Sequence, residues 1–567
     1  METSLAKTER TYIKLILGSF GALVIFIALC WGGFRFYRHW QEGHLVRRAA
    51  AFMSGGDLKT ASLNARRALQ LNAQNADATR IIAEIAEKSG DRTASDWRRK
   101  VLELNPGSVD DALALVRCAL WFNDLATAEK TLKSVEPTAL QKPEFYAASG
   151  RLAEMKKDVP KAEVHWAKAA ELAPEDSAYR FQLALVRLSL GDSAKRENAL
   201  GVLEQLRNDA TQRPAATRTL IIDGISQRGD PLKVRDLANE LQAYPAAFFS
   251  DRIMYLEILR QMRDPAYEEY LSRLKGEVPA KPSDLAALLS WMIRNRMNAE
   301  ALEFAKGLPV EAVAKWPVPL AVAEAQAQTK DWLELERLTR DSNWAGYDFL
   351  RRAYLARALR GQEKQLAAEQ ELGAAQKEAG ANPQMLSMLT QTIADWGWQN
   401  EAVELLWVLT KNPDTRLDAL QTLYNHYMKI ADTSGIYRTL TRFAEINPND
   451  TALQNNLAQV SLLLGADVDH ARKMAADLTT KEPTNPAYLS TYAFSLLSKG
   501  DVKGALQVMD GLKEEQLRDP SIATYYGLIL AAAGQKEKAR AFLGRSSEAN
   551  LLPEEKALVA KAESNLN

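Results

Sequence analysis

The stretch YLSTYAFSLLSKGDVKGALQVMDGLKEEQ, residues 488–516, contains two short apolar patterns separated by a break. In the first half, apolar residues recur at the spacing of one helix face, and the second half repeats that spacing after Gly500-Asp501. Glycine commonly ends a helix, and aspartate commonly caps the start of the next one. The stretch therefore predicts a helix, a tight turn and a second helix.

The same unit recurs along the chain with a period near 34 residues. One position of the second helix keeps a small or apolar residue at intervals of 34 or 35, namely Ala402, Ile436, Ala471, Ala505 and Ala539. The N-terminal part of the chain repeats the pattern at Ala61, Ala94, Ala128 and Ala162. A self-similar period of this length indicates stacked helix pairs, a solenoid, rather than one large globular core.

The best-kept unit carries a family resemblance. Gly150, Ala162, Trp166, Ala169 and Pro174 stand at positions 8, 20, 24, 27 and 32 of a 34-residue repeat. A small residue, an alanine, a bulky apolar residue, a small residue and a proline at these positions resemble the tetratricopeptide repeat. The resemblance implies an all-α, right-handed solenoid of antiparallel helix pairs, a superhelix whose leading helices line a concave groove.

The clarity of the repeat divides the chain into segments. The pattern is clear over 35–200 and 383–548 and degenerate over 201–382, where several prolines intrude. We still expect helix pairs in the middle segment because neither strand-like alternation nor a long polar linker occurs there. The alternative is an unrelated helical domain inserted between two repeat arrays. Residues 549–567 are expected to form a helix that caps the C-terminal end of the stack.

A membrane segment is predicted before the repeats. Residues 15–34, LILGSFGALVIFIALCWGGF, carry no charge and follow a short tail, residues 1–14. Twenty helical residues rise about 30 Å, the thickness of the hydrocarbon core of a bilayer. Trp31 and the aromatic residues after it are typical of the headgroup level. An uncleaved single-pass transmembrane helix is favoured over a signal peptide, whose apolar region is shorter, and over a lipoprotein processing site, where Leu29 is too bulky.

The orientation and assembly of that segment are open. Basic residues flank it on both sides, so the positive-inside rule does not decide, but the short tail favours a repeat domain outside the cytoplasm. The resemblance to membrane-anchored repeat proteins suggests that the membrane is a bacterial inner membrane. Gly18 and Ala22 have the small-xxx-small spacing that can pack two such helices into a homo-oligomer.

Composition and motifs favour a non-catalytic function. The chain has 72 basic and 72 acidic residues, so it shows no basic footprint for nucleic acid. Its two cysteines form no metal ribbon, and its five histidines are scattered. No HExxH, phosphate-binding loop or nucleophile elbow occurs. The sequence therefore predicts that the protein is not an enzyme and takes no cofactor and no metal.

The resemblance also implies a partner-binding groove, formed by positions 2, 5, 9, 12 and 13 of each leading helix. The N-terminal candidates are Arg117, Trp121 and Arg151, and the C-terminal candidates are Asn425, Met428, Val460, Phe494 and Leu528. The C-terminal set is apolar enough for a partner helix or peptide. The alternative is that these side chains only pack between neighbouring helices. Position 5 lacks the residues of the repeat subtype that clamps a terminal carboxylate.

We therefore expect a membrane-tethered, non-catalytic scaffold or adaptor that binds a protein or peptide partner through its superhelix. The alternatives are a structural or oligomerising membrane protein and an accessory subunit of a membrane enzyme complex.

Overall fold

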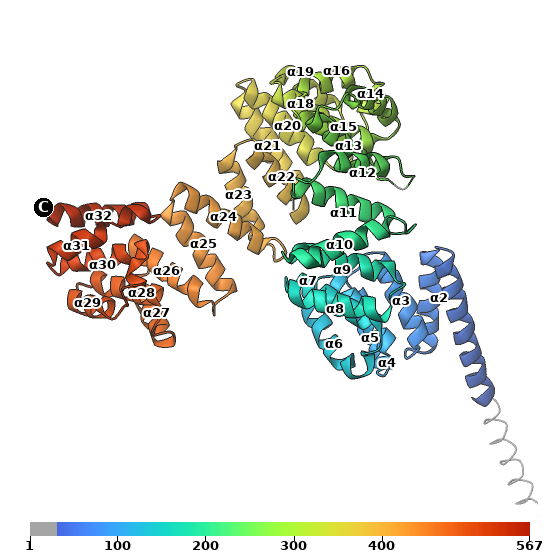
Figure 1. Ribbon diagram of the computed structural model, residues 1–567, viewed down its shortest axis with the longest axis horizontal. Coiled ribbons are helices and arrows are strands. Elements are labelled where there is room, and N and C mark those ends of the chain that lie inside the picture. The colour runs from blue at the N-terminus through green and yellow to red at the C-terminus, as the bar shows by residue number, and fades with distance from the viewer. Residues whose placement is uncertain (1–30, 246, 381, 567) are drawn as a thin grey trace, which may run out of the picture. The chain divides into compact units, whose positions relative to one another are not determined.

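The computed structural model describes residues 31–245, 247–380 and 382–566 (Figure 1). These residues form helices joined by short turns, and no strand occurs among them. The predicted all-α architecture is therefore confirmed for this part of the chain.

The chain divides into two compact units, Met1–Ser272 and Arg273–Asn567. The described part of the first unit begins with a helical segment, residues 31–54. The helices that follow it are α2 (Leu58–Leu71), α3 (Ala76–Lys88), α4 (Ala94–Leu104), α5 (Val109–Trp121), α6 (Leu125–Ala139), α7 (Pro143–Met155), α8 (Val159–Leu172), α9 (Ser177–Ser189), α10 (Ser193–Leu206), α11 (Arg213–Ser226), α12 (Pro231–Gln242) and α13 (Phe249–Met262). Helix α14 (Tyr267–Glu277) begins in the first unit and ends in the second.

The second unit continues the same succession of helices. Its first part contains η1 (Val278–Ala280), α15 (Pro282–Arg294), α16 (Asn298–Lys306), α17 (Val310–Val313), α18 (Val318–Gln328), α19 (Trp332–Asp341), α20 (Asp348–Gly361), α21 (Gln365–Ala379), α22 (Pro383–Asp395) and α23 (Gln399–Leu409). Its last part contains α24 (Arg416–Ile430), α25 (Thr433–Ile446), α26 (Thr451–Leu464), α27 (Val468–Lys481), α28 (Pro486–Ser498), α29 (Val502–Asp510), η2 (Gln516–Arg518), α30 (Pro520–Ala532), α31 (Lys536–Leu543), η3 (Ser546–Glu548) and α32 (Pro553–Leu566).

Consecutive helices pack as pairs, each with a leading and a trailing member. The pairs α5–α6, α7–α8, α26–α27 and α28–α29 are in extensive contact. The leading helices begin at regular intervals of 33 to 35 residues, at Ala76, Val109, Pro143 and Ser177 in the first unit and at Pro383, Arg416, Thr451, Pro486 and Pro520 in the second. The 34-residue period of the sequence is therefore the period of the helix pairs.

The turn between the helices of a pair is built as the sequence predicts. In the quoted stretch, Gly500 has φ +86°, a conformation that suits glycine, and Asp501 accepts a hydrogen bond from the Gly504 N–H at 2.9 Å. Asp124 and Asp158 cap α6 and α8 in the same way. At these two turns Asn123 and Lys157 replace the glycine and hold φ at +61°.

The register inferred from the sequence is confirmed by what its key residues contact. A Cβ built on Gly150 would lie 2.9 Å from the ring of Trp166, so position 8 must be small where position 24 is bulky. Gly527 and Leu543 have the same relation at 2.8 Å. The alanines of position 20, such as Ala162 and Ala505, are fully buried. The fold is therefore TPR-like.

The degenerate middle segment also consists of packed helices. Helices α11 and α12 are in contact, as are α19 and α20, and α20 and α21. The prolines that interrupt the sequence pattern lie at helix starts, since Pro282 begins α15 and Pro319 lies in the first turn of α18. The described residues of this segment therefore form packed helices, and its assignment as degenerate repeats with boundaries at 200 and 382 stays a prediction.

The predicted transmembrane helix lies outside the described residues except for its last four, 31–34. Among the helices of the described residues, none has both the length and the apolar character needed to cross a bilayer. The predicted C-terminal helix is present as α32, but its buried face differs from a simple cap because it includes Glu555 together with Val559 and Leu566.

Candidate partner-binding surfaces

The N-terminal candidates lie on an exposed stripe of α5 and α7. From Asp111 to Leu120 every residue of α5 is buried except Arg117, and Trp121 follows one turn later with 78% of its surface exposed. Arg151 lies at the equivalent position of α7, which packs against α5. Its guanidinium donates to Glu154 Oε2 at 2.9 Å. Apart from Asp110 in its first turn, Arg117 and Trp121 are the exposed side chains of α5, a helix otherwise inside the repeat stack.

Helix α9 contributes to the same surface. The pKa of Tyr179 is raised by burial and by the charges of Glu144 and Asp176, and Arg117 opposes that shift. Arg117, Glu144 and Tyr179 come from three successive leading helices, and the area around α5 and α7 is continuous because these two helices are in contact. The area combines an exposed indole with charges of both signs, which suits a polar partner surface with one aromatic anchor.

The C-terminal candidates fall into two groups. Asn425 is exposed and accepts a hydrogen bond from Gln421 Nε2 at 3.0 Å, while Met428 is half-buried. Val460, Phe494 and Leu528 are only 6%, 5% and 6% exposed. The open apolar strip expected at these three positions is therefore not open in the structure.

The burial comes from neighbouring leading helices as well as from the C-terminal segment, since the Phe494 ring lies 4.9 Å from the ring of Tyr525 on α30. Phe494 and Leu528 belong to one apolar cluster with Val559 and Leu566 of α32. Val460 belongs to a second cluster, against which Leu552 packs immediately before α32. The face is apolar, as the sequence indicates, and packing between neighbouring helices is the alternative that the sequence left open for these side chains.

Helix α32 is fastened at its first turn by a buried polar group. Tyr525 of α30 donates its phenol hydrogen to Glu555, and Gln459 Nε2 of α26 donates to the same carboxylate at 3.2 Å and to Tyr525 Oη at 2.9 Å. Glu555 also accepts from the Leu552 N–H at 2.8 Å, which caps the helix. Burial, followed by the charge of Glu555, raises the pKa of Tyr525 well above its ordinary value, so the phenol keeps the proton that it donates.

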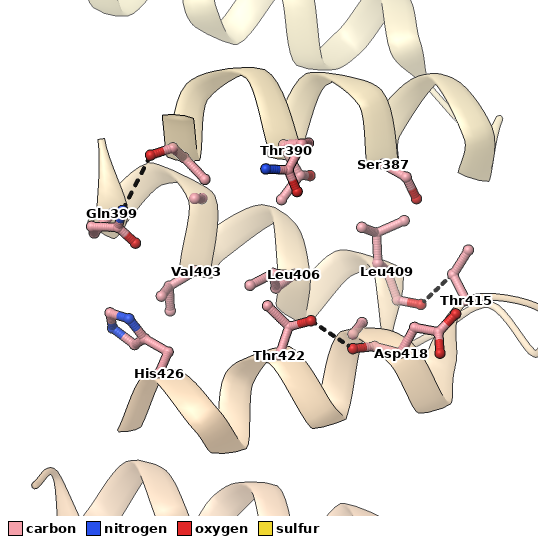
Figure 2. Close-up of a pocket in the computed structure, with 14 residues that line it drawn as sticks. Ser387, Thr390, Gln399, Val403, Leu406, Leu409, Thr415, Asp418, Thr422 and His426 are labelled. Atoms are coloured by element: carbon pink, nitrogen blue, oxygen red, sulfur yellow. Dashed lines mark hydrogen bonds between the residues drawn. The ribbon is translucent and has the colours of Figure 1, made fainter. Parts of the chain in front are cut away.

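A separate cavity of about 320 Å³ opens between α22 and α24 (Figure 2). Its floor is apolar and comes from α23, with Val403, Leu406 and Leu409. Ser387 and Thr390 border it from α22, and Asp418, Thr422 and His426 border it from α24. The hydroxyls of Thr390 and Thr422 are already used, since they donate to the carbonyls of Leu386 and Asp418 at 2.7 and 2.8 Å.

Sequence reasoning missed this cavity although it named the neighbouring Asn425. Three small residues, Ala394, Ala402 and Ala419, belong to its lining. With an apolar floor and few free polar groups, the cavity suits one apolar side chain of a partner better than a charged ligand.

The described residues contain no group of three or more His, Cys, Asp or Glu side chains that could hold a metal ion. Burial raises the pKa of the Cys118 thiol, so the reactive thiolate is disfavoured there.

No protein-family model matches the chain, and no curated protein matches it. Among solved structures, the APC/C hetero-tetramer Cut9–Hcn1 is similar with 12% identity and a TM-score of 0.32, over 92% of this chain and 96% of that chain. PilW, described as a widely conserved type IV pilus biogenesis factor, gives 15% identity and a TM-score of 0.28, over 42% and 94%. PilF of Pseudomonas aeruginosa gives 12% identity and a TM-score of 0.28, over 43% and 95%. Similarity this low carries no argument about function, so the class, a TPR-like helical-repeat protein, rests on the helix pairs and register of this chain.

Proposed function

We propose that this protein is a non-catalytic scaffold that binds a protein partner on the surface formed by α5, α7 and α9. The observation that carries the proposal is Trp121, which is 78% exposed one helical turn from Arg117. Tryptophan and arginine are the residue types that most often dominate binding energy at protein interfaces. A large indole left in water on a leading helix is more easily explained by a partner than by the stability of the repeat stack.

The test is quantitative capture of partners from native membranes by the full chain and two variants. Trp121→Ala combined with Arg117→Glu should weaken capture of the specific partner by at least about tenfold, since loss of one such anchor costs about 2 kcal/mol or more. Val164→Ala is the matched control because Val164 is 63% exposed on the trailing helix α8. Equal capture by both variants, with unchanged helical content, would remove this surface from the proposal.

A membrane tether is the second part of the proposal. Residues 31–40 are helical and exposed along their whole length. They carry five large aromatic side chains, of which Phe36 is 74% exposed, and Arg35 and Arg38 lie 4.9 and 5.8 Å from the ring centres of Trp31 and Phe34. Aromatic and basic side chains directly after the uncharged stretch 15–34 suit the headgroup region of a bilayer.

Vesicle flotation tests the tether in the full chain. Replacing Trp31, Phe34 and Phe36 with serine should reduce but not abolish co-flotation, whereas introducing two aspartates at positions 23 and 26 should abolish it. Flotation that survives the aspartates would exclude a spanning helix. Protease protection in spheroplasts then tests the proposed location of the repeats outside the cytoplasm.

A further inference from the structure

We infer that the leading-helix face of α26, α28 and α30 is a binding site for an amphipathic helix, and that the chain's own α32 occupies it as a displaceable internal ligand. This inference uses a different face from the Trp121 surface and does not depend on it. It concerns the kind of partner that the C-terminal repeats accept.

The first step is the reach of α32. A helix that merely capped the stack would contact the last pair, α30 and α31, and α32 does contact both. Its N-terminal end extends further, since Gln459 of α26 donates to Glu555 and Thr433, at the start of α25, donates to Glu554. At the other end, Arg540 of α31 donates to the Leu566 carbonyl at 2.6 Å. The helix therefore extends from α25 to α31 (Figure 1).

The second step is the way α32 is recognised. Its contacts form a pattern of one buried carboxylate in the first turn and apolar residues four and eleven positions later, Glu555, Val559 and Leu566. The receptor supplies a matching phenol and amide, Tyr525 and Gln459, beside apolar Phe494 and Leu528. An apolar helix face in an apolar groove is a general mode of peptide recognition, and the buried carboxylate adds specificity.

The third step is the weakness of the attachment. Helix α30, a leading helix, buries nine of its residues, whereas α32 buries three, the same number as the trailing helix α27. One of the three is a carboxylate, and burying a charge offsets much of what its hydrogen bonds contribute. Lys556, Ala557, Ala560 and Lys561 stay exposed on the outer face. Few buried apolar groups and a desolvated charge are the properties of a segment that opens locally before the rest of the unit.

A partner helix with the same pattern would meet competition from α32. A tethered ligand acts at an effective concentration in the millimolar range, so it suppresses binding of a free peptide of similar affinity. Weakening the attachment of α32 should expose the binding face. A separate peptide with the sequence of α32 should then bind to that face more tightly. This increase is the signature that separates an occupied binding site from a helix that is only part of the fold.

The experiment uses a fluorescent peptide of residues 549–566 and the full chain. The chain carrying Val559→Asp should bind the peptide at least about tenfold more tightly than the unchanged chain, because the internal competitor is weakened. Lys561→Ala, on the exposed face of α32, is the matched control and should leave the affinity unchanged. A peptide that itself carries Glu555→Gln and Val559→Asp should not bind to any of the chains. No gain in affinity for the folded Val559→Asp chain would overturn the inference.

Hydrogen exchange of the unchanged chain provides a second test that needs no variant. The amides of α32 should exchange faster than those of α28 and α30, because α32 unfolds locally while the repeats stay folded. Exchange of α32 at the same rate as α28 and α30 would show an integral helix and would also overturn the inference.

Discussion

The repeats of α3–α13 and those of α24–α32 share one helix-pair design but are held together by different forces. In the N-terminal array, ion pairs link successive repeats. Arg80 donates to both oxygens of Asp111 at 2.9 and 3.0 Å, and Arg218 does the same to Asp251 at 2.7 Å for each contact. Further links join different elements of the same array, namely Arg187–Glu163, Lys195–Glu163, Arg196–Asp223, Lys233–Glu204 and Arg235–Asp264.

The C-terminal array has a different balance. Among the described residues from 416 to 566, every ion pair joins side chains three or four positions apart, as Arg442–Glu445 does, so none of them links two repeats. Apolar contacts replace them, and one continuous cluster extends from α26 to α32. Three of the polar contacts that link distant elements in this array lie at the start of α32.

The difference shows how one repeat can provide two kinds of surface. Where paired charges join the leading helices, as at α3 and α5, side chains such as Trp121 can remain open to solvent. Where the leading helices present apolar side chains, as at Phe494, another helix must exclude water, and Tyr525 of the next leading helix packs against the Phe494 ring. The comparison predicts that the two arrays respond to different perturbations.

The largest expected effect comes from breaking one of the buried ion pairs. Asp251 is 2% exposed, so Arg218→Ala would leave its carboxylate without its guanidinium partner in a desolvated position. We expect a loss on the order of 3 kcal/mol in the stability of α11–α13, because a stranded buried charge costs about that much. Hydrogen exchange of α11–α13 in increasing urea measures the loss locally.

The matched change in the C-terminal array is Arg442→Ala. Arg442 and Glu445 are both more than half exposed, so the change should stay within about 0.5 kcal/mol. Equal losses of stability for Arg218→Ala and Arg442→Ala would mean that the ion pairs between repeats do not stabilise the N-terminal array.

The helix pairs and their register could be predicted because they follow from local residue choices. Gly150 and Trp166, or Ala505, occupy positions where only one size of side chain fits, so a period in the sequence reports a period in the packing. Arg98 is an instructive exception, because it stands at the bulky apolar position yet is 6% exposed. Its guanidinium is held by the Glu87 carboxylate at 2.6 Å, a partner from the neighbouring helix.

The surfaces could be predicted only in part. The exposure of Arg117 and Trp121 could be predicted because it depends on the positions of these residues within their own helix. The sequence left open whether Phe494 and Leu528 line a groove or pack between helices, and both are buried, with the Phe494 ring 4.9 Å from that of Tyr525. The cavity beside His426 arises from the spacing of two helices, which a single sequence does not specify.

A smaller effect is expected from the glycine shared by both arrays. Gly150→Ala would place a methyl group 2.9 Å from the ring of Trp166, whose Nε1 is fixed by a 2.8 Å bond to Glu154. Gly527→Ala would place one 2.8 Å from the side chain of Leu543. Overpacking of this kind costs about 1–3 kcal/mol, and the gain in helix propensity returns about 1 kcal/mol, so each variant should lose up to about 2 kcal/mol. Thermal melts of the full chain measure both.

Gly201→Ala is the control for the propensity term. Gly201 lies inside α10 and an added Cβ would meet no atom within 4 Å, so this variant should gain up to about 1 kcal/mol. A stabilised Gly150→Ala chain would show that the contact between positions 8 and 24 is looser than the structure indicates.

The smallest and most gradual effect is a difference in pH response between the arrays. Hydrogen bonds from Arg80 lower the pKa of Asp111, so its contribution to stability is present above the ordinary aspartate pKa and is lost as the pH falls through the lower folded value. Burial, and then the hydrogen bond to Asp510, raises the pKa of Tyr526 to about 12, so its contribution is present below pH 10 and is lost as the pH rises toward 12. Each group changes the stability by at most about 1.4 kcal/mol per pH unit.

Acid should therefore loosen the N-terminal array first, and alkali the C-terminal one, because the arginines that link the N-terminal repeats stay charged at high pH. Limited proteolysis with pepsin at pH 2–4 and with subtilisin at pH 10–12, followed by mapping of the first cuts, distinguishes the two arrays. Asp111→Asn should remove part of the acid response, and Tyr526→Phe should remove part of the alkaline response. If the first cuts fall in the same array at both low and high pH, the proposed difference between the arrays is wrong. Ion pairs would then not be the main stabilising contacts of the N-terminal array, or apolar contacts not those of the C-terminal array.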